Sequence, residues 1–97
     1  MFKNGFVLEV VRKFVKENPM SYNDYVSIIN KLRDDSYTVI EPLETAKDGR
    51  YFTDEENIII SADGIKFVVC TEWSIDNITP IILFAQKQGY EVVSFPK

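Results

Sequence analysis

A chain of 97 residues can bury one modest hydrophobic core, so we expect a single domain over residues 1–97. Apolar residues make up 45% of the chain and charged residues 27%, which is typical of a globular protein and excludes an intrinsically disordered one. No apolar run approaches the roughly 20 residues that a membrane span needs, and Glu9 interrupts the stretch that a secretory signal would require. A single cysteine cannot form an internal disulfide, and we therefore expect a cytoplasmic protein.

The absence of histidine and the uneven charge bear most directly on function. Without histidine, the chain lacks the commonest general base, the usual partner of a serine or cysteine nucleophile, and most zinc ligand sets. The formal net charge is −4, but residues 1–33 carry +3 and residues 64–97 are neutral. Residues 34–63 hold nine acids and two bases, a net charge of −7, and such asymmetry concerns binding partners rather than the fold.

The N-terminal third predicts two helices joined by a short turn. Residues 5–17 place apolar side chains at helical spacing, with charged side chains on the opposite face. Asn18-Pro19 ends this helix, because the residue before a proline avoids helical backbone angles. Ser21 is the predicted cap of a second helix whose apolar stripe extends to Leu32, so we expect an αα-hairpin.

The middle of the chain begins with a predicted strand over residues 37–41. The Asp48-Gly49 turn then predicts a short, exposed hairpin, because glycine tolerates the positive φ that a tight turn needs. This hairpin would pair residues 43–46 with residues 50–53.

A second hairpin gives the strongest strand signal in the chain. Residues 58–60 are a run of three isoleucines, Asp63-Gly64 supplies the turn, and residues 65–71 are again strand-like. The second strand alternates between an apolar face and a mixed face, which another element would partly cover. The first strand is apolar on both faces, which predicts a central position in the sheet.

The C-terminal part predicts one helix and one strand. Thr79-Pro80 has the pattern of a helix start, with a capping residue followed by proline at the first helical position. The helix would cover residues 81–88 and end at Gly89 in the left-handed conformation. Residues 90–95 are the last predicted strand.

Together these elements predict the α+β class. We expect a mainly antiparallel sheet of four to five strands, packed on one face by the N-terminal αα-hairpin and one short C-terminal helix.

The sequence contains no recognisable catalytic, nucleotide-binding or metal-binding motif, and we expect no cofactor. Asp63, Lys66 and Glu72 could form a carboxylate-carboxylate-lysine set that holds magnesium and cleaves a phosphodiester, but their spacing differs from that of such nucleases. The chain has no histidine that could lower the pKa of Cys70, so we expect this cysteine to be a buried structural residue rather than a nucleophile. The second predicted helix lacks bases in its first turns, so we do not expect direct binding to nucleic acid.

The acidic segment admits two interpretations: a solvated surface that keeps the protein soluble, or a surface that binds a partner. Its three contiguous acids lack the alternating ligand spacing of a calcium loop. Tyrosine and tryptophan beside charged residues are common anchors in interfaces. The candidate partner-binding residues are Asp34, Asp35, Glu41, Glu44, Asp48, Asp54, Glu55, Glu56, Asp63, Tyr51 and Trp73.

The leading hypothesis is a non-enzymatic interaction module whose acidic face binds a protein with a basic surface. Alternate residues of a strand lie about 6.6–6.8 Å apart, close to twice the ~3.4 Å spacing of phosphates along a DNA strand. In its sharpest form, the hypothesis is a small phage-type inhibitor that mimics DNA and occupies a host nucleic-acid-binding protein. The first alternative is a self-associating structural or regulatory module, such as a homodimer, and a less favoured one is a carboxylate-dependent nuclease.

Overall fold

The computed structural model describes residues 2–33, 38–47, 49–73 and 75–90, and it is a mixture of helices and an antiparallel sheet, as the α+β prediction requires. The elements in chain order are helix α1 (Phe2–Glu17), helix α2 (Tyr22–Ile29), the 3₁₀ turn η1 (Asn30–Leu32), strand β1 (Ile40–Pro42), the 3₁₀ turn η2 (Glu55–Asn57), strand β2 (Ile59–Ile60), strand β3 (Lys66–Val69) and helix α3 (Ile75–Lys87).

The sheet has three strands in the described residues, so the prediction of four to five strands was wrong. Its order is β1-β3-β2, with both pairs antiparallel. The run of isoleucines forms the edge strand β2 rather than a central strand, and Ile60 is 56% exposed. The central strand is β3, where Phe67, Val68 and Val69 are all fully buried.

The first predicted hairpin does not form. Residues 43–46 continue from β1 as a turn, in which the Ala46 N–H donates to the Pro42 carbonyl. Tyr51 pairs instead with Cys70, across from the extension of β3. Tyr51 thus pairs with a residue nineteen positions further along the chain. The Asp48-Gly49 pattern indicates only a local turn, so it could not predict this pairing. Of the last predicted strand, residues 91–95 lie outside the described residues.

The segment that flanks β3 on the β2 side is interrupted by an excursion. A continuous antiparallel ladder that began with Tyr51 opposite Cys70 would place Asp54 opposite Phe67. Ile59 occupies that position instead, so five extra residues loop out between the two paired stretches. The 3₁₀ turn η2 lies in this excursion.

Two predicted helix ends are confirmed, the cap at Ser21 and the left-handed residue Gly89, whereas α2 ends at Ile29 and its predicted stripe reaches Leu32 through the 3₁₀ turn η1. The Ser21 side chain accepts a hydrogen bond from the Asp24 N–H at 3.2 Å, as an N-cap should. Gly89 has φ +82° after the end of α3, where its N–H donates to the Gln86 carbonyl and the N–H of Tyr90 donates to that of Ala85.

Helix α3 begins at Ile75, before the predicted start, so Pro80 lies inside it. Ile78, Ile81 and Ala85 recur at helical spacing, and each is at most 2% exposed. Fully burying one isoleucine stabilises a fold by about 1.5–3 kcal/mol. Burial of Ile78 in the additional turns therefore offsets the helical hydrogen bond that Pro80 cannot donate.

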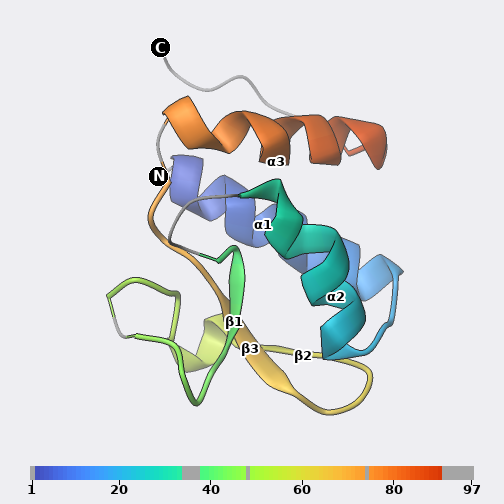
Figure 1. Cartoon of the computed structure of the whole chain (residues 1–97), viewed down its shortest axis with the longest axis vertical. Coiled ribbons are helices and arrows are strands. Elements are labelled where there is room, and N and C mark those ends of the chain that lie inside the picture. The colour runs from blue at the N-terminus through green and yellow to red at the C-terminus, as the bar shows by residue number, and fades with distance from the viewer. Residues whose placement is uncertain (1, 34–37, 48, 74, 91–97) are drawn as a thin grey trace.

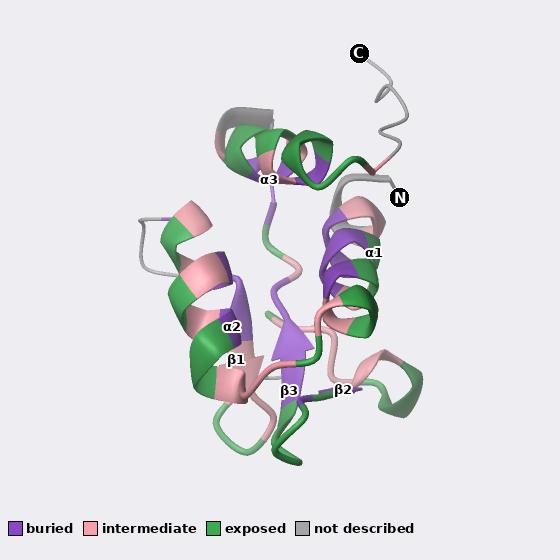
Figure 2. Cartoon of the chain, turned by 90° about the vertical axis from the view of Figure 1, so that its right-hand side faces the viewer, coloured by how far each residue is buried: buried purple, intermediate pink, exposed green. Residues whose placement is uncertain are grey.

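The sheet lies at one end of the molecule and α3 at the other, with α1 and α2 between them (Figures 1 and 2). Helix α1 contacts both β3 and α3. Three rings from different elements meet in the core: the Tyr25 ring lies 6.2 Å from Phe14 and 5.8 Å from Phe67. Helix α3 joins this core through Phe84, whose ring lies 5.1 Å from that of Phe14. The two N-terminal helices are thus joined through the aromatic core.

Two glycine substitutions test this backbone geometry. Gly64 in the turn between β2 and β3 has φ +85°, and a Cβ there would meet no atom within 4 Å. Gly64→Ala should therefore destabilise the protein by about 1–2 kcal/mol through backbone strain alone. The matched control is Gly5→Ala, within α1 and equally free of neighbours, which should stabilise by about 0.5–1 kcal/mol. Urea unfolding measures both, and shifts of the same sign would contradict the assigned turn.

Candidate interaction surface

The candidate acids border the sheet on more than one side. Glu41 lies in β1 and Glu44 in the turn after it, whereas Asp54, Glu55 and Glu56 lie in the excursion beside β2. Asp34, Asp35 and Asp48 fall outside the described residues. Because β3 separates β1 from β2, the described acids are divided between two edges of the sheet and do not form one continuous row.

The most accessible group is Asp54, Glu55 and Glu56, which we call the acidic turn. All three residues are exposed. The backbone is closed by hydrogen bonds from the Asn57 N–H to the Asp54 carbonyl at 2.8 Å and from the Ile58 N–H to the Glu55 carbonyl at 3.3 Å. A 3₁₀ turn has three residues per turn, so successive side chains fan out by roughly 120°. The acidic turn therefore presents clustered charge on an ordered backbone.

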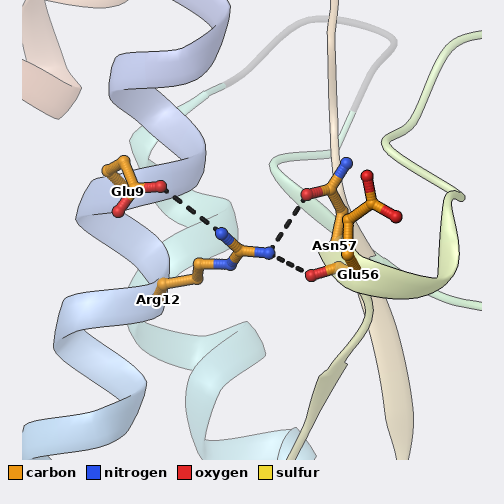
Figure 3. A network of polar contacts seen from close by, with 4 residues as sticks. All are labelled: Glu9, Arg12, Glu56 and Asn57. Atoms are coloured by element: carbon orange, nitrogen blue, oxygen red, sulfur yellow. Dashed lines mark hydrogen bonds and ion pairs between the residues drawn. The ribbon is translucent and has the colours of Figure 1, made fainter.

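Arg12 of α1 holds the acidic turn in place (Figure 3). Its Nη2 donates to the Glu56 backbone carbonyl and, at 3.0 Å, to Asn57 Oδ1. Its Nη1 lies 3.4 Å from Glu9 Oε2, so one guanidinium joins α1 to the end of η2. The Glu56 carboxylate takes no part in these bonds and stays exposed. The helical spacing predicts Arg12 on the charged face of this helix, opposite the apolar side chains, and no local signal links it to residues more than forty positions away.

Glu41 is committed to internal hydrogen bonds. Its two carboxylate oxygens accept from Thr38 Oγ1 at 3.0 Å and from Thr45 Oγ1 at 2.8 Å. The Thr38 hydroxyl has one proton, which it donates to Glu41. The Tyr51 hydroxyl is therefore the donor in its hydrogen bond with Thr38 Oγ1 at 2.9 Å. Burial, with a contribution from the nearby Glu41 charge, raises the pKa of Tyr22 to about 12. Glu41 and Tyr51 thus stabilise the fold at this edge.

Asp63 also has an internal role. It accepts hydrogen bonds from the Ser61 hydroxyl and, at 3.1 Å, from the N–H of Tyr22 in the first turn of α2. The bond from Ser61, together with that from Tyr22, lowers the pKa of the Asp63 carboxyl. The Ala62 N–H donates to the Met20 carbonyl at 2.9 Å, so two contacts dock the β2–β3 turn on the start of α2.

Trp73 lies in the core rather than on an accessible surface. It is 8% exposed, and its indole N–H donates to the Cys70 carbonyl at 2.8 Å. The Arg33 guanidinium lies 4.6 Å from the Trp73 ring centroid and donates to the Glu72 carbonyl at 2.6 Å. This buried cation–π pair fixes the segment between β3 and α3. The position of Trp73 beside charged residues is therefore explained by an internal contact, and no binding partner is needed to account for it.

The carboxylate-lysine set considered for a nuclease is not assembled. Asp63 and Lys66 lie at one end of β3, and Glu72 lies beyond the other end. Six residues of extended chain span about 20 Å, too far for one magnesium ion to contact both acids. Within the described residues, no group of three or more histidine, cysteine, aspartate or glutamate side chains could hold a metal ion.

Comparison with protein-family models, with curated proteins and with solved structures finds no match for this chain. Among the described residues, no helix combines the length and the apolar character that crossing a membrane requires.

The role of Asp63 predicts a change in acid stability. Because its folded pKa lies below the unfolded value, the carboxylate contributes stability above about pH 4 that is lost as the pH falls through the folded pKa. Asp63→Asn should lower the Tm at pH 7 by several degrees and flatten the decline of Tm between pH 4 and pH 2. Thermal unfolding followed by circular dichroism across this range measures both effects.

Glu44→Gln is the matched control, since Glu44 is an exposed acid in the turn after β1. It should leave the Tm at pH 7 nearly unchanged. If the Asp63 and Glu44 variants had the same acid profile, the assigned clamp between the hairpin and α2 would be wrong.

Proposed function

We propose that this protein is a non-enzymatic interaction module that binds a basic protein surface through the acidic turn. The observation that carries the proposal is the presentation of Asp54, Glu55 and Glu56 on an ordered turn fixed to α1 by Arg12. The backbone at this site is ordered before a partner arrives, so binding would cost little additional conformational entropy there. Clustered charge of one sign also speeds the association of partners with the opposite sign.

The class of partner that this charge fits best is a nucleic-acid-binding protein, whose own binding site is basic. We propose that the protein acts as an inhibitor of such a protein by competing with DNA. Among the candidate acids, Asp63 and Glu41 serve the fold, so the competing charge is assigned to the acidic turn; Glu44 follows β1, at the other edge of the sheet. The mimicry would rest on local charge density rather than on a straight row of phosphate-like groups.

The main test compares two variants that each remove three negative charges. Asp54→Asn, Glu55→Gln and Glu56→Gln neutralise the acidic turn, and they should weaken binding to the partner at least tenfold. The partner would be captured with the tagged protein from source-cell lysate and identified. Its affinity would then be measured by calorimetry at several salt concentrations, since an electrostatic interface weakens with salt. Duplex DNA should release it.

The control variant carries Glu17→Gln, Asp24→Asn and Glu72→Gln, which change the net charge equally but lie outside the acidic turn, in α1, in α2 and after β3. It should bind like the wild type. Arg12→Lys keeps the charge of α1 but cannot reproduce the forked contact, so it should weaken binding several-fold. Equal affinity of both triple variants, with equal salt dependence, would refute the proposal.

Self-association is a second candidate, favoured by the apolar tip of the β2–β3 hairpin. Ile60 is 56% exposed and Ile65 is 40% exposed, and β2 is a short edge strand that could pair with another chain. The double variant Ile60→Thr and Ile65→Thr should then shift a dimer toward monomer in sedimentation equilibrium. A wild-type protein that stays monomeric up to millimolar concentration would exclude this candidate.

A further inference from the structure

A groove lies between α2 with η1 on one side and α3 on the other. It has a volume of about 800 Å³, and its apolar lining includes Ile28, Leu32, Leu83 and Phe84. Leu83 is 58% exposed, and it adjoins further apolar lining residues rather than standing alone on the surface. The groove therefore leaves the apolar side chain of Leu83 open to solvent, on the helix that lies at the other end of the molecule from the sheet (Figure 1).

The packing of α3 explains why the groove exists. One face of this helix carries Ile78, Ile81 and Ala85 into the core. The groove residues Pro80, Leu83, Phe84 and Lys87 follow one another at i, i+3, i+4 and i+7, so they form a second stripe on the same helix. The core contacts of α3 are made chiefly with α1, and α2 is left at a distance across the groove (Figure 2).

The wall opposite has the same spacing. Ile28, Lys31 and Leu32 lie at i, i+3 and i+4 along α2 and η1. Each wall thus combines apolar side chains with one lysine, Lys31 on this side and Lys87 on α3. Among the described lining residues these two lysines are the charged ones, although the whole chain has a net charge of −4.

We propose that this groove is a docking site for a short amphipathic helix with acidic flanks. On one wall Leu83 is exposed, and the remaining large apolar side chains of the lining are half-buried. Two walls with such apolar side chains at helical spacing form a surface that a helix with apolar residues at i, i+3 or i+4, and i+7 can fill. The distance from Pro80 to Lys87 along α3 is about 10 Å, which corresponds to two turns of a bound helix. Glutamate or aspartate on the flanks would pair with Lys31 and Lys87 at the rim. This site shares no residue with the acidic turn and does not depend on its proposed role.

The test uses two synthetic helical peptides of the same length, each with leucines at the anchor positions. One carries glutamates on both flanks and the other carries lysines. Both are titrated into the full-length, isotope-labelled protein while amide chemical shifts are followed. The glutamate peptide should bind at least tenfold more tightly, with the largest shifts at groove residues of α2, η1 and α3.

Two variants make the result decisive. Leu83→Glu places a charge on the apolar lining and should abolish binding, and because Leu83 is exposed, the fold should survive. Lys31→Glu with Lys87→Glu should reverse the preference, so that the lysine peptide binds better. The variant with a neutral acidic turn should bind the glutamate peptide like the wild type, so failure of this proposal and failure of the proposed function can be distinguished.

Several outcomes would overturn the proposal. These are equal affinity for the two peptides, no binding of either at millimolar concentration, or shifts concentrated on α1 rather than on the groove. A wild-type protein that dimerises through the groove, and that Leu83→Glu converts to monomer, would show that a second copy of the chain is the occupant instead.

Discussion

The fold depends on how Tyr25 is buried. This side chain is fully buried between Phe14 of α1 and Phe67 of β3, so one ring joins the first helix, the second helix and the sheet. Its hydroxyl donates to the Asn18 carbonyl at 2.6 Å and accepts from the Met20 N–H at 3.0 Å. Leaving such a hydroxyl unpaired in the core would cost about 1–3 kcal/mol, so the loop between α1 and α2 is fixed by the same residue that fills the core.

The loop between α1 and α2, together with the start of α2, then contacts the β2–β3 hairpin. Met20 accepts a hydrogen bond from Ala62, and Tyr22 donates to Asp63, both from the turn between β2 and β3. The position of β3 follows, because the hairpin cannot shift along α2 without breaking these contacts. With β3 fixed, the excursion before β2 brings the acidic turn within reach of Arg12. The candidate interaction surface is therefore a consequence of the core and not an appendage to it.

Sequence reasoning succeeded where the determining interaction is local. The cap at Ser21, the turn at Gly64 and the left-handed end at Gly89 each depend on residues within a few positions. Elements whose structure is decided by a residue far away in the sequence could not be predicted. Tyr51 pairs with Cys70 rather than within an Asp-Gly hairpin, and burial of Ile78 keeps Pro80 inside a helix.

The same limit applies to the candidate site. Counting charges in residues 34–63 gives nine acids, but a sequence cannot tell which acids the fold uses. The structure assigns Asp63 and Glu41 to internal hydrogen bonds, while the acidic turn remains exposed. The contact from Arg12 crosses more than forty residues, so the feature that gives the acidic turn its order was not visible in any local pattern.

The acidic turn and the groove between α2 and α3 carry opposite charge, so binding at each should respond differently to added salt. At physiological ionic strength, charges are screened over about 8 Å, so a partner at one end of the molecule senses mainly the charges at that end. A basic partner at the acidic turn would therefore be attracted mainly by the local acids, and added salt should weaken its binding. An acidic helix in the groove would be attracted by Lys31 and Lys87, while its apolar contacts with the groove would not be screened by salt. The affinity of the helix should therefore fall less steeply with added salt than that of a basic partner at the acidic turn, so salt titration should distinguish the two proposed surfaces.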